Sequence, residues 1–280
     1  YVLVYLQQKQ KILEHNDSMY ASFLEKAILR FTKGESTVLE KIIAETQRGQ
    51  IATQLNHLKS DREILQLQFQ LLLNTATIFT PAVDNPKLMF GSIPDKSIIY
   101  NHPIIQSLRQ QKQLATINTQ LEESRLMPNL SIGYSNQSIQ GMGPDNVLYP
   151  KSERFSSIQF GIGLPLFFNS QKAKIQSAEV LELMSENNYK FGVQSLETEY
   201  ESTYKKYLTQ LQTVQYFEKT TLPNATIITK TADEQFAAGE INYLEWTMLI
   251  NNTVALENHY ADAVNNLNQT IIQLNYLTSK

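Results

Sequence analysis

The sequence predicts a mainly α-helical protein made of long antiparallel coiled-coil hairpins of helices, with one β-hairpin. Three observations support this fold class. A ten-residue helix–turn–helix motif occurs twice, and each copy is followed by apolar residues in heptad spacing. One stretch between the copies changes to a period of two. Glycine and proline are also scarce, at 10 and 9 of 280 residues, as long helices require.

The repeated motif, called the elbow below, reads FTKGESTVLE at residues 31–40 and FAAGEINYLE at residues 236–245. Five of its positions are identical at one offset, 239 − 34 = 205 residues. Gly34 and Gly239 stand where a helix would end, a position that favours a residue able to adopt positive φ. Each elbow is therefore expected to end one helix and begin the next.

The second half of each elbow carries the signals of a helix start. Thr37 and Asn242 are residue types that cap helix N-termini, and each is followed three residues later by a glutamate, Glu40 or Glu245. This is the spacing of the capping box, in which the glutamate bonds back to the cap residue. We expect capping to be the first role of both glutamates.

Apolar residues follow each elbow in steps of three and four, which is the pattern of long packed helices. Subtracting 205 from the second seam gives the first, position by position, so the chain contains a tandem duplication. The first seam is Ile51, Leu55, Leu58, Arg62, Leu65, Phe69 and Leu72, and the second is Leu256, Tyr260, Ala263, Leu267, Thr270, Leu274 and Leu277.

The duplication predicts two regions. Residues 1–100 hold the helical hairpin of the first repeat and a connection, and the repeat is expected to be incomplete at its N-terminus because Tyr1 lies inside an amphipathic pattern. Residues 101–280 hold the second repeat, with a β-hairpin at about 129–167 and a helical hairpin at about 169–278. The helices are expected at about 1–31, 36–79, 103–125, 169–221, a continuation to 236 that Pro223 breaks or kinks, and a last helix ending near 278.

The two strands are expected at 129–139 and 156–167, joined by a loop rich in Gly, Pro and Asn. Each has a strongly apolar face and a face of small or polar residues, and each is about as long as the ~10 residues of a membrane-crossing strand. A lipid-facing exterior with a wet lumen fits this pattern. A hairpin packed on a soluble core fits it as well, and the strands alone favour that simpler interpretation.

Composition and spacing exclude several classes of function. The net charge of −3 indicates no nucleic-acid partner, and the absence of cysteine excludes disulfides and thiol chemistry. The four histidines (His15, His57, His102 and His259) lack the spacing of a metal-binding helix. No catalytic triad, phosphate loop or paired-carboxylate site stands out, so we expect no enzyme, no cofactor and no metal site. Trp246, beside the second elbow, is either a packing residue or a contact for a partner protein, and packing is the expected role.

The order helix–strand–strand–helix, then an elbow and a long helix, resembles the TolC family of outer-membrane efflux channels. Residues 102–134 resemble the family's helix leading into a β-hairpin, and 156–179 resemble its second strand turning back into helix. The stretch GESTVLEK…QFQLLLNT, within residues 34–75, is most similar to versions paired with or fused to CusA/CzcA-type heavy-metal pumps of the resistance-nodulation-division (RND) class. A family protomer has two β-hairpins, whereas this chain has one.

The resemblance implies a TolC-like α-barrel with a β-hairpin contributing to an outer-membrane β-barrel. It implies a passive exit duct in the outer membrane and periplasm of a Gram-negative bacterium, a homotrimer in full-length form, in contact with outer-membrane lipid. The duct would receive substrates, with metal cations as one candidate, from an inner-membrane RND pump through a periplasmic adaptor (membrane fusion protein). The alternative is a soluble periplasmic coiled-coil protein, structural or adaptor-like, with a small β-domain.

The same resemblance implies roles for residues of the elbows. Glu40 and Glu245 are candidates for an acidic ring that lines the pore, because rings of carboxylates favour cations. The turns themselves are candidates for contact with the adaptor, and the residues concerned are Gly34, Glu35, Gly239 and Glu240.

Overall fold

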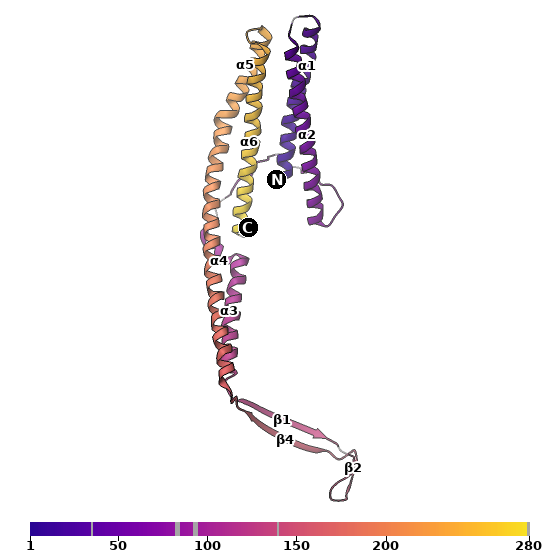
Figure 1. Ribbon diagram of the computed structural model, residues 1–280, viewed down its shortest axis with the longest axis vertical. Helices are drawn as coiled ribbons and strands as arrows, with labels where there is room; N and C mark the ends of the chain where they lie inside the picture. The colour runs from indigo at the N-terminus through magenta and orange to yellow at the C-terminus, as the bar shows by residue number, and fades with distance from the viewer. Residues whose placement is uncertain (35, 82–84, 92–94, 139, 279–280) are drawn as a thin grey trace. The chain divides into compact units, whose positions relative to one another are not determined.

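The chain folds into two compact units, and Figure 1 shows the elements of each in a computed structural model. No helix in the described part of the chain is both long and apolar enough to cross a membrane. The first unit comprises Tyr1–Lys96 and Thr198–Lys280, and the second comprises Ser97–Glu197. The structure describes residues 1–34, 36–81, 85–91, 95–138 and 140–278.

The first unit contains two antiparallel helical hairpins. Helices α1 (Val2–Thr32) and α2 (Val38–Leu73) form one hairpin, and α5 (Leu222–Ala238) and α6 (Tyr243–Leu277) form the other. Helix α1 also packs against α6, which joins the hairpins. Both elbows lie at the same end of this unit, at the top of Figure 1. The expected pair of related hairpins is therefore present, with each elbow at its bend.

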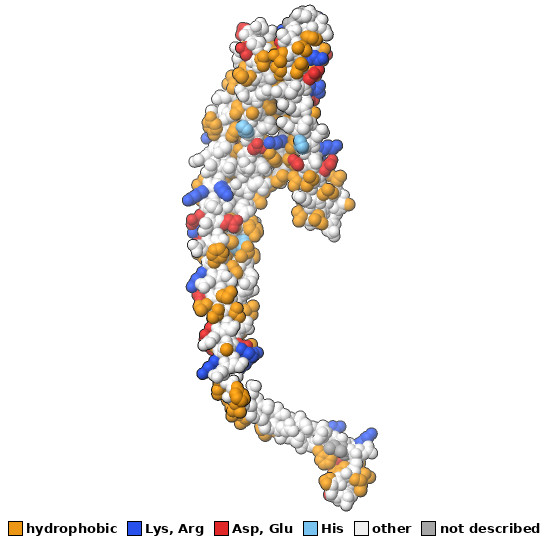
Figure 2. All heavy atoms as spheres, in the orientation of Figure 1, with side chains coloured by type: hydrophobic (Ala, Val, Ile, Leu, Met, Phe, Trp, Pro, Cys, Tyr) orange, Lys and Arg blue, Asp and Glu red, His pale blue; other side chains and the backbone are white. Residues whose placement is uncertain are grey.

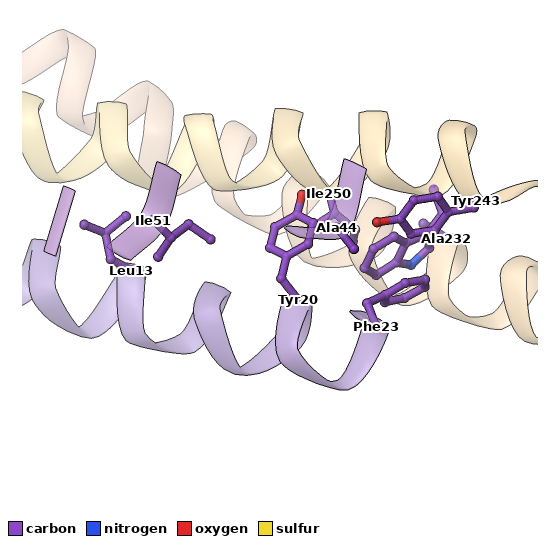
Figure 3. Packing of buried hydrophobic residues seen from close by; sticks show 9 residues of the cluster. Leu13, Tyr20, Phe23, Ala44, Ile51, Ala232, Tyr243 and Ile250 are labelled. Atoms are coloured by element: carbon purple, nitrogen blue, oxygen red, sulfur yellow. The ribbon is translucent and has the colours of Figure 1, made fainter. Parts of the chain in front are cut away.

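The core of the first unit lies beside the elbows and draws on all four helices (Figure 3). Large aromatic side chains from α1 and α6 dominate it, and small alanines let the neighbouring helices approach. The cluster consists of Leu13, Tyr20 and Phe23 of α1, Ala44 and Ile51 of α2, Ala232 of α5, and Tyr243, Trp246 and Ile250 of α6.

The two duplicated seams are buried to different extents. In α6 the seam is buried to the end of the helix, as at Leu267, Leu274 and Leu277. In α2 only the first seam residue, Ile51, is buried, and Leu72 at the other end is 82% exposed. The heptad pattern thus predicted both helices, but among the described residues the α2 seam is covered only near the elbow, at Ile51, whereas the α6 seam is covered to its end.

Helix α2 ends earlier than the sequence predicted. The expected end near Phe79 is wrong, because Asn74 adopts a left-handed conformation with φ of 49° and stops the helix at Leu73. Asparagine tolerates this conformation better than most residues, which makes it a helix stop without glycine or proline. Part of the connection that follows, residues 85–91, packs against α6 through Asn268.

Helix α4 (Phe168–Tyr216) continues into α5 through a π-helical turn, η2 (Phe217–Thr221). Pro223 lies in the first turn of α5. A proline removes one backbone donor and its ring collides with the carbonyl four residues earlier, so the wider π-turn accommodates it without ending the helix. The expected break or kink near residue 222 is therefore a change of helix type.

The second unit contains a 3₁₀ turn, helix α3, the strands and the first part of α4. The 3₁₀ turn η1 (Lys96–Asn101) begins at the boundary, and α3 (Pro103–Ser124) follows it. The buried His102 caps α3, because its Nδ1 accepts a hydrogen bond from the Ile104 amide at 3.3 Å. Helices α3 and α4 are tied by side chains, including a 2.7 Å bond from the Thr116 hydroxyl to Glu182.

Strands β1 (Asn129–Gln137) and β4 (Phe155–Gly163) pair antiparallel and are called the ribbon below. Both expected strands are present, although each ends before its predicted C-terminal limit. The loop between them contains a second pair that the sequence did not predict, β2 (Gly141–Met142) with β3 (Leu148–Tyr149).

One face of the ribbon is apolar and uncovered. The register places Leu130 opposite Ile162, Ile132 opposite Phe160, and Tyr134 opposite Ile158, all on one side. Ile132 is 75% exposed and Phe160 is 79% exposed. The other side carries Asn, Ser, Gly and Gln, with Phe155 at the end near the loop, and Figure 2 shows the ribbon largely free of hydrophobic side chains in its view. Packing of the apolar face on a soluble core, as the simpler interpretation expected, is absent from the described residues.

The two compact units cut across the two repeats. The division at about residue 100 describes a duplication in sequence, whereas the units describe which segments pack together. The assignment of 1–100 and 101–280 to two repeats thus stays a prediction.

Candidate functional site

Each elbow turns on a glycine in the left-handed conformation. Gly34 has φ of 76° and Gly239 has φ of 77°. At the second elbow the Glu240 amide donates to the Gln235 carbonyl at 2.9 Å, and the Gly239 amide donates to the Phe236 carbonyl at 3.1 Å. These two bonds form a Schellman motif, which satisfies carbonyls at the helix end. The predicted role of both glycines in ending a helix is confirmed.

The helix starts that follow the glycines differ. Asn242 forms the complete capping box: its side chain accepts from the Glu245 amide at 3.0 Å, and the Glu245 carboxylate accepts from the Asn242 amide at 2.8 Å. The equivalent expectation for Glu40 is wrong, because Thr37 makes no side-chain capping bond. The Glu40 carboxylate instead lies 3.7 Å from the guanidinium of Arg30, at the other side of the turn.

Residues of the two elbows meet in one open cleft of about 660 Å³. Of the predicted site residues, Glu40, Gly239, Glu240 and Glu245 line this elbow cleft. Gly34 ends α1 without lining it, and Glu35 lies outside the described residues. Lys26 and Arg30 of α1 also line the cleft, and no pattern in the sequence predicted this basic contribution.

Trp246 anchors the aromatic cluster behind the cleft. Its ring stacks on Phe23 with 3.9 Å between the centroids, and its indole Nε1 donates to the Asp233 carboxylate at 2.8 Å. The side chain is 2% exposed, which confirms the prediction that Trp246 is a packing residue. Phe23 and Asp233 belong to different helices, and no local pattern in the sequence pairs them with Trp246.

A polar link joins the two hairpins farther from the elbows. The Asp262 carboxylate of α6 accepts a 2.6 Å hydrogen bond from the Tyr5 hydroxyl and lies 2.7 Å from the Lys9 ammonium, both of α1. Partial burial raises the pKa of Asp262, but the bonds from Lys9 and Tyr5 outweigh it and hold that pKa below its usual value. Nearer the elbows, the Tyr20 hydroxyl donates to Asn251 at 2.6 Å, and burial raises the pKa of Tyr20 to about 12.

These sites combine packing, turns and ion pairs. Among the residues that the structure describes, no group of three or more His, Cys, Asp or Glu side chains is placed to hold a metal ion. Of the carboxylates that line the elbow cleft, Glu245 serves as a cap, Glu40 lies close to a guanidinium, and Glu240 is exposed. Such an arrangement suits contact with a partner or passage of a solute.

Comparison with known proteins gives a consistent result. Residues 96–279, about two thirds of the chain, match the protein family described as outer membrane efflux protein. No curated protein matches the chain in sequence.

Solved structures of outer-membrane proteins share the fold at low sequence identity. The Campylobacter jejuni outer membrane channel CmeC is 15% identical with a TM-score of 0.86, and the match covers 99% of this chain and 60% of CmeC. VceC of Vibrio cholerae is 14% identical with a TM-score of 0.85, covering 99% and 66%. CusC is 16% identical with a TM-score of 0.83, also covering 99% and 66%. The expected TolC-like, mainly helical fold is confirmed, and the chain spans 60 to 66% of the length of these three proteins.

Proposed function

The chain belongs to the outer membrane efflux protein family, and on that premise we propose that it forms part of the wall of an outer-membrane exit duct. The family comprises channel proteins and not enzymes, so the chain is not an enzyme. In the proposed duct the ribbon contributes two strands to a barrel in the outer membrane. The helices continue the wall into the periplasm of a Gram-negative bacterium.

The apolar face of the ribbon is the observation that carries this proposal. Strands β1 and β4 have nine residues each, close to the ~9–11 residues of a membrane-spanning strand. From Leu130 to Tyr134 on β1 and from Ile158 to Ile162 on β4 the apolar side chains share one face and are exposed to solvent. The opposite face is small and polar apart from Phe155 at its far end. Lipid on the first side and a watery lumen on the second would satisfy both faces.

A homotrimer is part of the proposal, because two strands cannot close a barrel and leave unpaired edges. Three copies of the full-length protein, each with a second hairpin as in TolC-family protomers, would close it. The elbow cleft is proposed to receive a periplasmic adaptor. The support for this contact is the charged side chains that both hairpins contribute to the cleft, beside the partly buried ring of Phe236.

An inner-membrane RND pump is proposed as the source of energy and of substrate choice. The heavy-metal type of pump, and metal cations as cargo, rest on the sequence resemblance of the first elbow and the helix after it. Glu40 and Glu245 would add negative charge to the inner end of the duct, which favours cations. Glu245 is the better pore-lining candidate of the two, because its side chain is exposed and Glu40 lies close to Arg30.

A charge placed on either face of the ribbon tests the proposal. Phe160→Lys puts an ammonium on the apolar face, and Gln159→Lys puts one on the opposite face one residue away. Lysine near the middle of a lipid-facing strand costs about 2–4 kcal/mol, whereas a lumen position tolerates it. We expect Phe160→Lys to lower the amount of folded trimer recovered from outer membranes at least severalfold, and Gln159→Lys to leave it near the wild-type amount.

Equal recovery of the two variants would contradict a lipid-facing role for the apolar face. A full-length protein that stays monomeric and soluble without detergent would favour the periplasmic coiled-coil alternative instead.

A further inference from the structure

The apolar face of the ribbon changes character toward the end farthest from the helices. From Leu130 to Tyr134 on β1 the side chains on this face are apolar or aromatic. Asn136 and Ser156 follow on the same face as a cross-strand pair, because alternate residues of a strand share a side. Beyond them lies Arg154. The order along the face is thus apolar, tyrosine, amide and hydroxyl, then guanidinium.

Hydrogen bonds connect the polar part of this gradient. The Asn136 amide donates to the Tyr134 hydroxyl at 3.1 Å and to the Ser156 hydroxyl at 3.0 Å. The Arg154 guanidinium donates from Nη1 to the Asn136 Oδ1 at 3.1 Å. Arg154 is therefore held against the polar end of the apolar face by one of its five donor hydrogens.

Among the residues that the structure describes, no ion pair joins the Arg154 guanidinium to a carboxylate. Within the described residues, neither Asp145 nor Glu153 of the same loop pairs with Arg154, and Asp145 is engaged with the Tyr149 hydroxyl at 2.7 Å. Arg154 is exposed, so most of its guanidinium faces solvent. The Arg154 guanidinium is thus held at the edge of an apolar surface, and no carboxylate of the described residues forms an ion pair with it.

We propose that Arg154 binds a phosphate of a phosphorylated glycolipid in the outer leaflet, with Tyr134 at the level where the headgroups begin. The site rests on the proposed function, since it requires the apolar face to lie in lipid with the helices on the periplasmic side. Tyrosine is favoured at a membrane–water interface, and the planar guanidinium matches two phosphate oxygens at once. The lipid chains would cover the apolar residues below Tyr134 while the phosphate pairs with Arg154.

The test uses the full-length protein, purified from outer membranes in detergent and titrated with bisphosphorylated lipid A by native mass spectrometry. Arg154→Gln removes the charge and keeps a hydrogen-bonding side chain, and Arg109→Gln makes the same change on an exposed position of α3. We expect Arg154→Gln to raise the apparent Kd about tenfold, the scale of one lost charge-assisted contact, and Arg109→Gln to leave it within about twofold. Arg154→Lys should fall between, because lysine keeps the charge without the fork.

Two further arms identify the ligand. Lipid A without its phosphates should bind the wild-type protein as weakly as bisphosphorylated lipid A binds Arg154→Gln. The loss of affinity on removing the phosphates is measured on the wild-type protein alone, so it does not depend on the folding of a variant. Inorganic phosphate should fail to displace lipid A at equal concentration, because it cannot occupy the apolar face.

Equal lipid A affinity of the wild type and Arg154→Gln would overturn the site. Displacement by inorganic phosphate would also overturn it, in favour of a simple anion site. Either result in a detergent-dependent, membrane-extracted protein leaves the proposed duct intact. A protein that needs no detergent and binds no lipid in any variant would instead remove the duct proposal.

Discussion

The two elbows have the same glycine but different caps, and the difference traces to one residue. Thr37 and Asn242 both have extended backbone torsions suited to a cap. In the first elbow Arg30 stands across the turn and lies close to Glu40, whereas the residue 205 positions later is Gln235, which carries no charge. Glu245 therefore has no such cation to compete with the cap, and it completes the box.

Replacing each cap residue by alanine should reveal this asymmetry. Asn242→Ala removes a bond to the Glu245 amide, and we expect it to lower the free energy of unfolding by about 1 kcal/mol. Thr37→Ala removes no capping bond, and we expect a change below about 0.5 kcal/mol. Urea unfolding followed by far-UV circular dichroism measures both. Equal losses would mean that Thr37 caps its helix in solution.

At the residue scale, the sequence specified the backbone of the elbows better than their side-chain partners. Positive φ at Gly34 and Gly239 follows from residue type and position alone. The partner of Glu40 depends on a competition between a backbone amide and a guanidinium across a turn. The capping-box spacing identifies the backbone amide as a partner of the glutamate, but it gives no information about a guanidinium across the turn.

At the scale of elements, the connection after α2 shows how a loop is held by a helix. Asn268 of α6 is 3% exposed; its Oδ1 accepts from the Leu88 amide at 2.8 Å, and its Nδ2 donates to the Pro86 carbonyl at 2.6 Å. An ion pair of 2.7 Å between Lys87 and Glu218 of the π-helical turn adds to this attachment.

Removal of the Asn268 amide should release the connection. We expect Asn268→Ala to cost roughly 2 kcal/mol, because it leaves a backbone donor and acceptor without their partner. Limited trypsin digestion should then cut after Lys87 several times faster than in the wild type. The control is Asn266→Ala, an exposed position two residues away on α6. If both variants are cut at the same rate, the amide does not hold the connection.

Periodicity predicted the type of each long element and was less informative about its ends. The change from heptad spacing to alternation located both strands of the ribbon. The end of α2 was missed because asparagine stops a helix through its own conformation and leaves the apolar pattern unbroken. The pair β2–β3 was missed because two residues are too few to display a period.

At the scale of the whole molecule, the two helical hairpins are joined by residues far apart in sequence. Tyr5 and Asp262 are 257 positions apart, and only the packing of α1 against α6 brings them together. The duplication predicted two hairpins but contained no signal for which helices would touch. The sequence likewise contained no signal that residues of both elbows would line one cleft.

The link at Asp262 should make stability depend on pH. Because the pKa of Asp262 is lowered by folding, the link contributes above the unfolded pKa of about 4 and is lost as the pH falls through the lower, folded value. Burial lowers the pKa of Lys9, but bonds to Asp262 and Tyr5 raise it overall, so the link persists until strongly alkaline pH.

Asp262→Asn should therefore destabilise the protein at pH 7 by about 0.5–1 kcal/mol, a modest amount because the pair is partly exposed. The difference from the wild type should shrink between pH 5 and pH 2 and vanish when the wild-type carboxylate is protonated. Urea midpoints measured across this range provide the test. A difference that stays constant down to pH 2 would show that the charge of Asp262 is not the source.

Trp246 is the single tryptophan of the chain, and its indole is enclosed by rings from α1, α5 and α6 beside the elbow cleft. Its intrinsic fluorescence is consequently a native optical reporter of the structure around the two elbows. Wavelength and quenching of that emission would register spreading of the two hairpins or arrival of another protein there, with no dye attached.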